Sequence, residues 1–139
     1  MSGEADQVKW RGVRPISGIR GIWPDVDAVR AHARAYQSGT GSLIAYTVPS
    51  GKILFISTYF FSSRLSVDGS DYGFIGVRDA SDVVQFVMIY HYYDFKGQLA
   101  TTAPFAPALE ALAGWDVFIQ SYDVNLDVNG GFFGWLEDA

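Results

Sequence analysis

The sequence predicts an all-β domain: an antiparallel β-sandwich of jelly-roll type, with seven to eight strands and an extended N-terminal arm. Runs of β-branched and aromatic residues recur between short turns that contain Gly, Pro, Asp or Ser. No segment demands a helix of ordinary length. At 139 residues, 49% hydrophobic and 18% charged, the chain is long enough and apolar enough to bury one core. Two packed antiparallel sheets are the usual result of such a pattern.

The chain is organised around residues 46–63, YTVPSGKILFISTYFFSS. Pro49 fixes its own φ and Gly51 can adopt a positive φ, so the Pro-Ser-Gly segment predicts a turn. After the turn, apolar and aromatic side chains occupy both the odd and the even positions (the two parities) of the strand, so they point to both of its faces. This pattern indicates a strand that is buried on both faces, or on one face with a subunit contact on the other.

We expect two parts, an N-terminal arm at residues 1–24 and a sandwich domain at residues 25–139. Residues 10–23, WRGVRPISGIRGIW, fit neither a helix nor a regular strand and predict an extended arm that packs through Trp10 and Trp23. Residues 1–34 carry a net charge of +2 and the remainder carries −7. The arm therefore either docks on the acidic surface of a neighbouring subunit or is an ordinary solvated segment.

Residues 25–37, DVDAVRAHARAYQ, fit two interpretations. Four alanines, the Pro24-Asp25 start and Gly39 beyond the end favour a short helix. Strict alternation of apolar residues with Arg30, His32 and Arg34 favours a strand. We prefer the strand, since the Gly-Thr-Gly-Ser segment that follows turns the chain into another strand as a hairpin does.

The remaining strands are expected at intervals bounded by turns. Residues 83–93, VVQFVMIYHYY, are the most β-prone run. Pro104 and Pro107 make residues 99–112 an edge strand or an extended crossing segment, because proline cannot donate to a ladder. The other expected strands are residues 43–48, 52–63, 72–78, 115–122 and 125–136.

Composition excludes several classes. The chain has no cysteine, so a disulfide framework, a zinc-thiolate site and a thiol nucleophile are excluded. A net charge of −5 argues against nucleic-acid binding by the folded body. The first ten residues lack an apolar signal core, and no apolar run is long enough for a bilayer. We expect a soluble product that is cytoplasmic on synthesis and that can be part of a virion.

The order of motifs resembles that of small jelly-roll proteins of bacterial and phage genomes. A YTVPSGK turn at residues 46–52 is followed by a strand ending in Ser-Ser, a proline-flanked PFAPALEAL segment, GWDVFIQS, and NGGFFGWLED with its Gly134-Trp135 pair. The resemblance covers about residues 43–138 and leaves the arm unmatched. It implies a trimeric virion or surface component, and none of its motifs is catalytic.

The sequence offers little support for a catalytic role, and we expect a non-enzymatic protein with no catalytic residue, metal or cofactor. A cupin-type metal site needs several histidines near one another, whereas His32 and His91 lie far apart in the sequence. The Asp/Asn alternation at residues 123–129 fails the EF-hand spacing and instead predicts a strand with one apolar face. Neither GxSxG nor a phosphate-binding loop is present.

Aromatic residues make up 16% of the chain, more than a small core can hide, so some are expected at contacts. The leading hypothesis is a self-associating structural component of a larger assembly such as a phage virion, most simply a homotrimer, with possible contacts to other virion or surface proteins. The second is a carbohydrate-binding module, and the third a small cupin-type enzyme. Candidate interface residues are Trp10, Trp23, Tyr59, Phe61, Tyr90, Tyr92 and Tyr93. Candidate glycan-binding residues are Tyr90, Tyr92, Tyr93, Trp115 and Tyr122.

Overall fold

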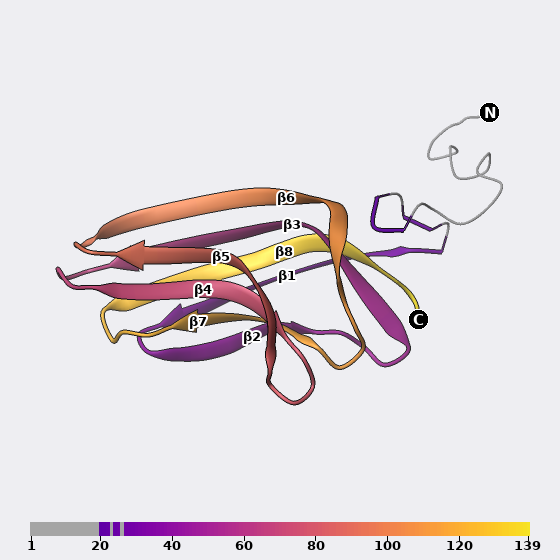
Figure 1. Ribbon diagram of the computed structural model, residues 1–139, viewed down its shortest axis with the longest axis horizontal. Helices are drawn as coiled ribbons and strands as arrows, with labels where there is room; N and C mark the ends of the chain where they lie inside the picture. Colours follow the sequence, from indigo (N-terminus) through magenta and orange to yellow (C-terminus); the bar gives the residue numbers. More distant parts are fainter. Residues whose placement is uncertain (1–19, 23, 26) are drawn as a thin grey trace.

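The computed structural model describes residues 20–22, 24–25 and 27–139, which form eight strands in two stacked four-stranded sheets (Figure 1). The first sheet has the order β1-β8-β3-β6, and the second has the order β2-β7-β4-β5. Every strand pair is antiparallel. Within the described residues, no helix is long and apolar enough to span a membrane. The strands are β1 (Val29–Ser38), β2 (Gly41–Thr47), β3 (Lys52–Leu65), β4 (Asp71–Arg78), β5 (Val84–Tyr93), β6 (Gly97–Ala111), β7 (Asp116–Ser121) and β8 (Leu126–Asp138).

The strands pair as a ribbon folded back on itself: β1 with β8, β2 with β7, β3 with β6, and β4 with β5. Successive strands lie in opposite sheets except at the β4–β5 hairpin. This winding is the jelly-roll arrangement of an eight-stranded sandwich. The predicted fold class, an all-β antiparallel sandwich, is confirmed.

The ambiguous N-terminal segment is a strand, and the helix interpretation is wrong. Along β1, Ala31 and Ala35 are buried while Arg30, His32 and Arg34 are exposed. The small alanines face the interior and the charged side chains face solvent, so the period-two pattern decides the structure. The ladder with β8 then supplies the backbone partners that a helix would have supplied itself.

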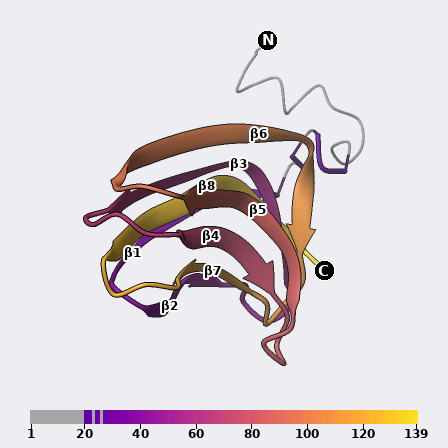
Figure 2. The same cartoon turned by 60° about the vertical axis from the view of Figure 1, so that its left-hand side comes forward.

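β3 lies inside the first sheet, between β8 and β6, as the apolar run on both parities predicts. Leu54, Ile56 and Phe61 point into the main core between the sheets. Phe55 faces outward, yet it is fully buried because Trp135 stacks on it with ring centroids 5.4 Å apart. One extra residue at Ser57 shifts the register of β3 against β8, and β3 bends in this region (Figure 2).

β6 is the edge strand that its prolines predict. Its pairing with β3 jumps from Pro104 to Leu109, so the intervening residues bulge out of the ladder. Part of the N-terminal segment fills this gap, since the Ala108 amide donates to the Gly21 carbonyl. The Arg20 guanidinium lies over the Phe55 ring and pairs with Glu110, its Nε donating at 2.8 Å.

β8 must run between β1 and β3 with two glycines at points of close approach. A β-carbon on Gly131 would lie 2.0 Å from the Ala33 carbonyl oxygen, and one on Gly134 would lie 1.9 Å from the Phe55 carbonyl oxygen. Both obstacles are backbone atoms of neighbouring strands, which cannot move without breaking the ladder. The C-terminal glycines are therefore a requirement of the first sheet.

We expect Gly134→Ala to lower the free energy of unfolding by about 3 kcal/mol, because the new methyl group must push the β3 backbone away. Urea unfolding followed by tryptophan fluorescence measures the change. The matched control is Gly97→Ala on β6, where an added β-carbon meets nothing within 4 Å. The control is expected to stay within about 0.5 kcal/mol of the parent. Equal effects of the two substitutions would contradict the steric argument.

Candidate functional site: an aromatic sheet face and a polar groove

Five aromatic rings gather on the outer side of the second sheet, which we call the aromatic face. Tyr90 and Tyr122 are exposed there, Tyr72 is half-buried, and Phe74 and Phe118 are buried. Tyr72 and Tyr90 stack with centroids 5.1 Å apart, and Tyr72 also contacts Tyr122 at 4.3 Å. Phe74 meets Phe118 edge-on at 5.5 Å. The rings come from β4, β5, β7 and the residue after β7, and they share a face because alternate residues of a strand point the same way.

Exposed apolar side chains surround the rings. Ile44 lies opposite Phe118 in the β2–β7 register, Val87 lies opposite Gly76, and Tyr92 lies opposite Tyr72. All three of these side chains are exposed. Neither the rings nor these neighbours carry a charge, so the centre of the face is apolar apart from tyrosine hydroxyls.

A charged group closes one end of the aromatic face. Arg78 lies over the Phe118 ring, 4.7 Å from its centroid. Its Nε is 3.5 Å from an Asp116 carboxylate oxygen and 3.4 Å from one of Asp82. Asp116 in turn accepts a hydrogen bond of 2.6 Å from the Thr47 hydroxyl. This network fixes the Arg78 guanidinium, so the edge of the apolar area is polar and ordered.

Two tyrosines of the face, Tyr90 and Tyr122, favour their neutral form. Partial burial in the cluster, together with the neighbouring Tyr72 and Tyr92, raises the pKa of Tyr90 above its ordinary value. Burial and the neighbouring Tyr72 and Tyr90 raise the pKa of Tyr122 in the same way. The face therefore presents neutral hydroxyl donors beside ring surfaces, which suits a dry contact or a neutral ligand.

The structure places the predicted aromatic residues in different environments. Tyr90 and Tyr92 are exposed on the aromatic face, and Tyr122 joins the same cluster. Trp115 packs against the main core instead. Trp10 and Trp23 lie outside the described residues.

Three predicted interface residues need correction. Tyr59, Phe61 and Tyr93 belong to the buried core of the sandwich and offer no surface to a partner. Tyr59 and Phe61 occupy the inward parity of β3. Tyr93 is the inward neighbour of Tyr92 on β5, and its hydroxyl donates to the Ser63 carbonyl. A strand that is aromatic on both parities does not reveal by itself which parity faces the second sheet.

Sequence analysis missed three members of the aromatic face: Tyr72, Phe74 and Phe118. The signal was present, because YGFIGVR places Tyr72 and Phe74 on one parity and Ile75 and Val77 on the other. The aliphatic parity supplies the core, which leaves the aromatic parity outside. Assigning β4 by parity would have placed both rings on the outer side of the sheet, where Tyr72 is half-buried and Phe74 is buried.

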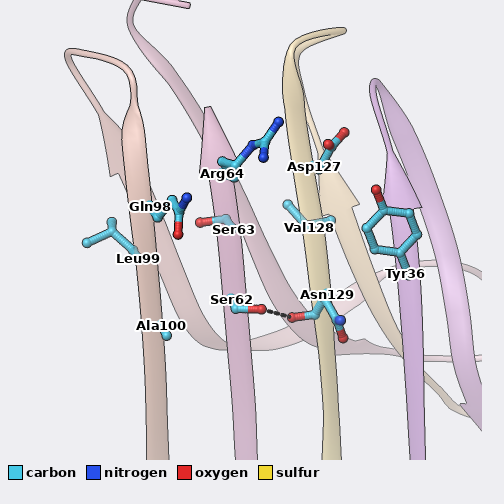
Figure 3. Close-up of a pocket in the computed structure, with 10 residues that line it drawn as sticks. All are labelled: Tyr36, Ser62, Ser63, Arg64, Gln98, Leu99, Ala100, Asp127, Val128 and Asn129. Carbon is cyan, nitrogen blue, oxygen red and sulfur yellow. Dashed lines mark hydrogen bonds between the residues drawn. The ribbon is translucent and has the colours of Figure 1, made fainter. Parts of the chain in front are cut away.

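A second feature, a groove of about 700 Å³, crosses the outer surface of the first sheet (Figure 3). The polar side chains that line it come from all four strands of that sheet. The Ser62 hydroxyl donates to the Asn129 carbonyl across β3 and β8. Ala100 and Ser62 are small and also border a neighbouring hollow of about 400 Å³ that contains Phe60 and Phe133. The polar lining is Tyr36, Ser62, Arg64, Gln98, Asp127 and Asn129.

Several polar groups of the groove are available to a ligand. Within the described residues, the side chains of Tyr36, Arg64, Gln98 and Asn129 form no hydrogen bond with one another or with the rest of the chain. Asp127 is partly used, since one carboxylate oxygen accepts from the Ser38 hydroxyl at 3.0 Å and from the Gly39 amide at 3.2 Å. The groove thus offers donors and acceptors beside two phenylalanine rings.

A buried polar cluster joins the two sheets beside this groove. His91 on β5 has its Nδ1 2.7 Å from the Ser63 hydroxyl on β3 and its Nε2 2.8 Å from the Thr101 hydroxyl on β6. The Tyr93 hydroxyl lies 2.6 Å from the Ser63 hydroxyl. The Phe61 ring packs on the imidazole. With His91 only 4% exposed, the Ser63–His91 pair is a structural clamp rather than an accessible nucleophile.

Metal-binding groups do not converge in the part of the chain that the structure describes: no three His, Asp or Glu side chains there are placed to hold one ion. Asp127 and Asn129 point outward from β8, while Leu126 and Val128 are buried. The predicted strand with one apolar face is confirmed for residues 126–129, whereas Asp123 and Asn125 lie in the turn before β8 and Val124 is 71% exposed.

Comparisons with known proteins give low similarity. No family model matches the chain, and no curated protein matches its sequence. A chain of the cyanophage Pam1 capsid asymmetric unit is 14% identical, covers 78% of this chain and 84% of its own, and has a TM-score of 0.43. A chain of the nora virus structure is 11% identical over 79% of this chain and 57% of its own, at 0.39. The globular domain of zebrafish complement 1qA protein is 15% identical over 75% and 96%, at 0.37.

We expect stability to fall as the pH drops below about 6.5, because burial lowers the pKa of His91 beneath its ordinary value of 6.5. In that range the unfolded chain binds a proton that the native chain resists, so the free energy of unfolding decreases with decreasing pH. Above the ordinary value the imidazole is neutral in both states and contributes no pH dependence. Urea titrations between pH 7.5 and 5 measure the trend.

The matched controls use the only two histidines of the chain. His91→Gln should flatten the pH dependence in this range, although it also lowers overall stability. His32→Gln removes an exposed imidazole and should leave the slope as in the parent. A parent slope that persists in His91→Gln would show that other groups cause it.

Proposed function

We propose that the protein is a non-enzymatic structural component that self-associates through the aromatic face and forms part of a larger assembly such as a virion. The observation that carries the proposal is an uncharged cluster of aromatic rings on the outer side of the second sheet, in which Tyr90 and Tyr122 are exposed while Phe74 and Phe118 are buried. Exposed Ile44, Val87 and Tyr92 border the cluster. Contiguous apolar surface of this kind on a folded domain marks a contact with another macromolecule.

The composition of the face supports a protein partner. Tyrosine and phenylalanine are enriched at the centres of interfaces, and charged residues are depleted there. On the aromatic face the rings form the centre, and the Arg78–Asp116 pair lies at the border. This arrangement of an apolar centre and a polar rim favours burial against a second folded surface.

The partner that we favour is a further copy of the same chain, as a homotrimer. Two of the similar structures come from viruses, but their similarity is too low to argue from, and the proposal depends on the surface itself. A net charge of −5 per chain opposes the approach of two copies over charged surface, and the aromatic face offers a contact without charged groups. The N-terminal arm, residues 1–24, is proposed as a second contact between subunits of the assembly.

We expect Ile44→Lys to weaken self-association at least tenfold, because it places an ammonium group in the apolar face. Ile44 is 45% exposed, so the folded monomer should tolerate the change. Sedimentation velocity across a concentration series measures the association. The matched control is Leu99→Lys on β6, where an apolar side chain with 44% exposure lies away from the face. A parent chain that stays monomeric at high micromolar concentration would refute the proposal.

A second candidate function, saccharide binding, is favoured by the groove on the first sheet. Tyr36, Gln98 and Asn129 present hydrogen-bonding groups without partners among the described residues, and Phe60 and Phe133 lie in the adjoining hollow. Sugars are bound by such combinations of polar groups and ring surfaces. This site differs from the aromatic residues that the sequence predicts for a glycan.

We expect Asn129→Ala to abolish any saccharide binding that the parent shows on a glycan array, because an amide that contacts the ligand is lost. Calorimetry with the selected sugar measures the affinity. Gln120→Ala on the opposite sheet is the control and should bind as the parent does. If the parent binds no glycan, or if Asn129→Ala binds equally well, the groove is not a saccharide site.

A further inference from the structure

Each sheet of a sandwich has two edge strands, and three of the four edges here carry protection against pairing with other chains. β1 presents Arg30 and Arg34 outward. β6 carries Pro104 and Pro107 and a bulge. β2 has only seven residues and a register shift between Ile44 and Tyr46. Charges, prolines, bulges and short length are the devices that keep sheet edges from associating.

The fourth edge, β5, has almost none of these devices. Its ten residues, VQFVMIYHYY, contain no charged residue and no proline. The register with β4 shifts between Ile89 and Val87 and again between Phe86 and Val84, so the first half of the strand is irregular. The second half, Ile89–Tyr93, pairs with β4 without a shift. In the described structure no strand pairs with β5 on its other side.

The regular half of β5 also borders the aromatic face. Tyr90 and Tyr92 share the outward parity and are 50% and 53% exposed. Tyr90 belongs to the ring cluster, whereas Tyr92 makes no ring contact in the described structure. A strand added along this edge would therefore continue the sheet, and its outward side chains would continue the aromatic face.

We propose that the Ile89–Tyr93 edge of β5 pairs antiparallel with the same edge of a second copy of this chain. A two-fold axis relates identical strands in an antiparallel way, so one edge serves as its own partner. Centred on His91, the register places Tyr90 of one copy opposite Tyr92 of the other, and Ile89 opposite Tyr93. Neither copy of the β5 edge carries a charged side chain, so the two edges do not repel each other although the chain as a whole has a net charge of −5.

This inference rests on the proposed function, since it names a second contact of the same self-associating chain. The edge contact joins two copies into one continuous eight-stranded sheet, and the two aromatic faces become one larger face on the same side. The face contact, proposed above as trimeric, then joins such pairs into an assembly that contains both two-fold and three-fold contacts. The two contacts use different atoms: backbone amides and carbonyls in the first, and ring surfaces in the second.

Hydrogen exchange measured at two concentrations tests the edge contact. At a concentration where the chain is associated, the amides of Ile89–Tyr93 that point away from β4 should be protected. On dilution to monomer these alternate amides should exchange quickly, while the amides bonded to β4 stay protected. An associated chain in which the outward amides exchange as fast as in the monomer would overturn the inference and leave the aromatic-face proposal standing.

Two substitutions separate the contacts. Tyr92→Lys places a charge at the edge, which also borders the aromatic face, and should remove the concentration-dependent protection of β5. Tyr36→Lys is the control on the edge strand β1, at a side chain with 57% exposure, and should leave this protection unchanged. Ile44→Lys should reduce the face-mediated species and retain β5 protection. Full β5 protection in Tyr92→Lys would refute edge pairing, and a parent that never associates would refute both proposals.

Discussion

The first sheet depends on β8 fitting between β1 and β3 at a distance that leaves no room for two of its β-carbons. Gly131 and Gly134 allow the Ala33 and Phe55 carbonyls to approach the β8 backbone closely. With β8 in place, Phe132 on β8 and Phe61 on β3 fill the core together. Phe55 on the opposite face is buried by Trp135, the next residue after Gly134. One strand thus supports the core, the outer ring pair and the site where Arg20 docks.

Strand positions follow from the sequence because turns and parity are local properties. The alternation of alanine and arginine along β1 identifies a strand at a place where composition alone suggests a helix. Pro104 and Pro107 identify β6 as an edge, because a central strand needs every amide in its ladder. The sheet order was not predictable, since it depends on pairs such as β1 with β8 that lie far apart in the chain. The bulge that receives Gly21 depends on the same long-range contacts.

The candidate surfaces were only partly predictable. Tyr90, Tyr92 and Tyr122 could be named because they cluster near strand ends, and the structure brings them to one sheet. Tyr59, Phe61 and Tyr93 could not be distinguished from them, because a strand with rings on both parities gives no sign of which side meets the second sheet. The groove needed the register of four strands, since its lining residues come from β1, β3, β6 and β8. Which residues of a strand share a face can be determined from that strand alone, whereas a groove depends on the register of the whole sheet.

The ribbon pairing of β1 with β8 constrains how the chain folds during synthesis. Val29 has its ladder partner at Leu136, about a hundred residues later in the chain, so closing this contact carries a large loop entropy. A ribosome releases β1 well before β8 exists, and until then β1 and β3 both lack the neighbour that separates them. Folding should therefore be slow, largely post-translational and limited by the arrival of the last strand. Until that strand arrives, the facing edges of β1 and β3 are open to pairing with a wrong neighbour.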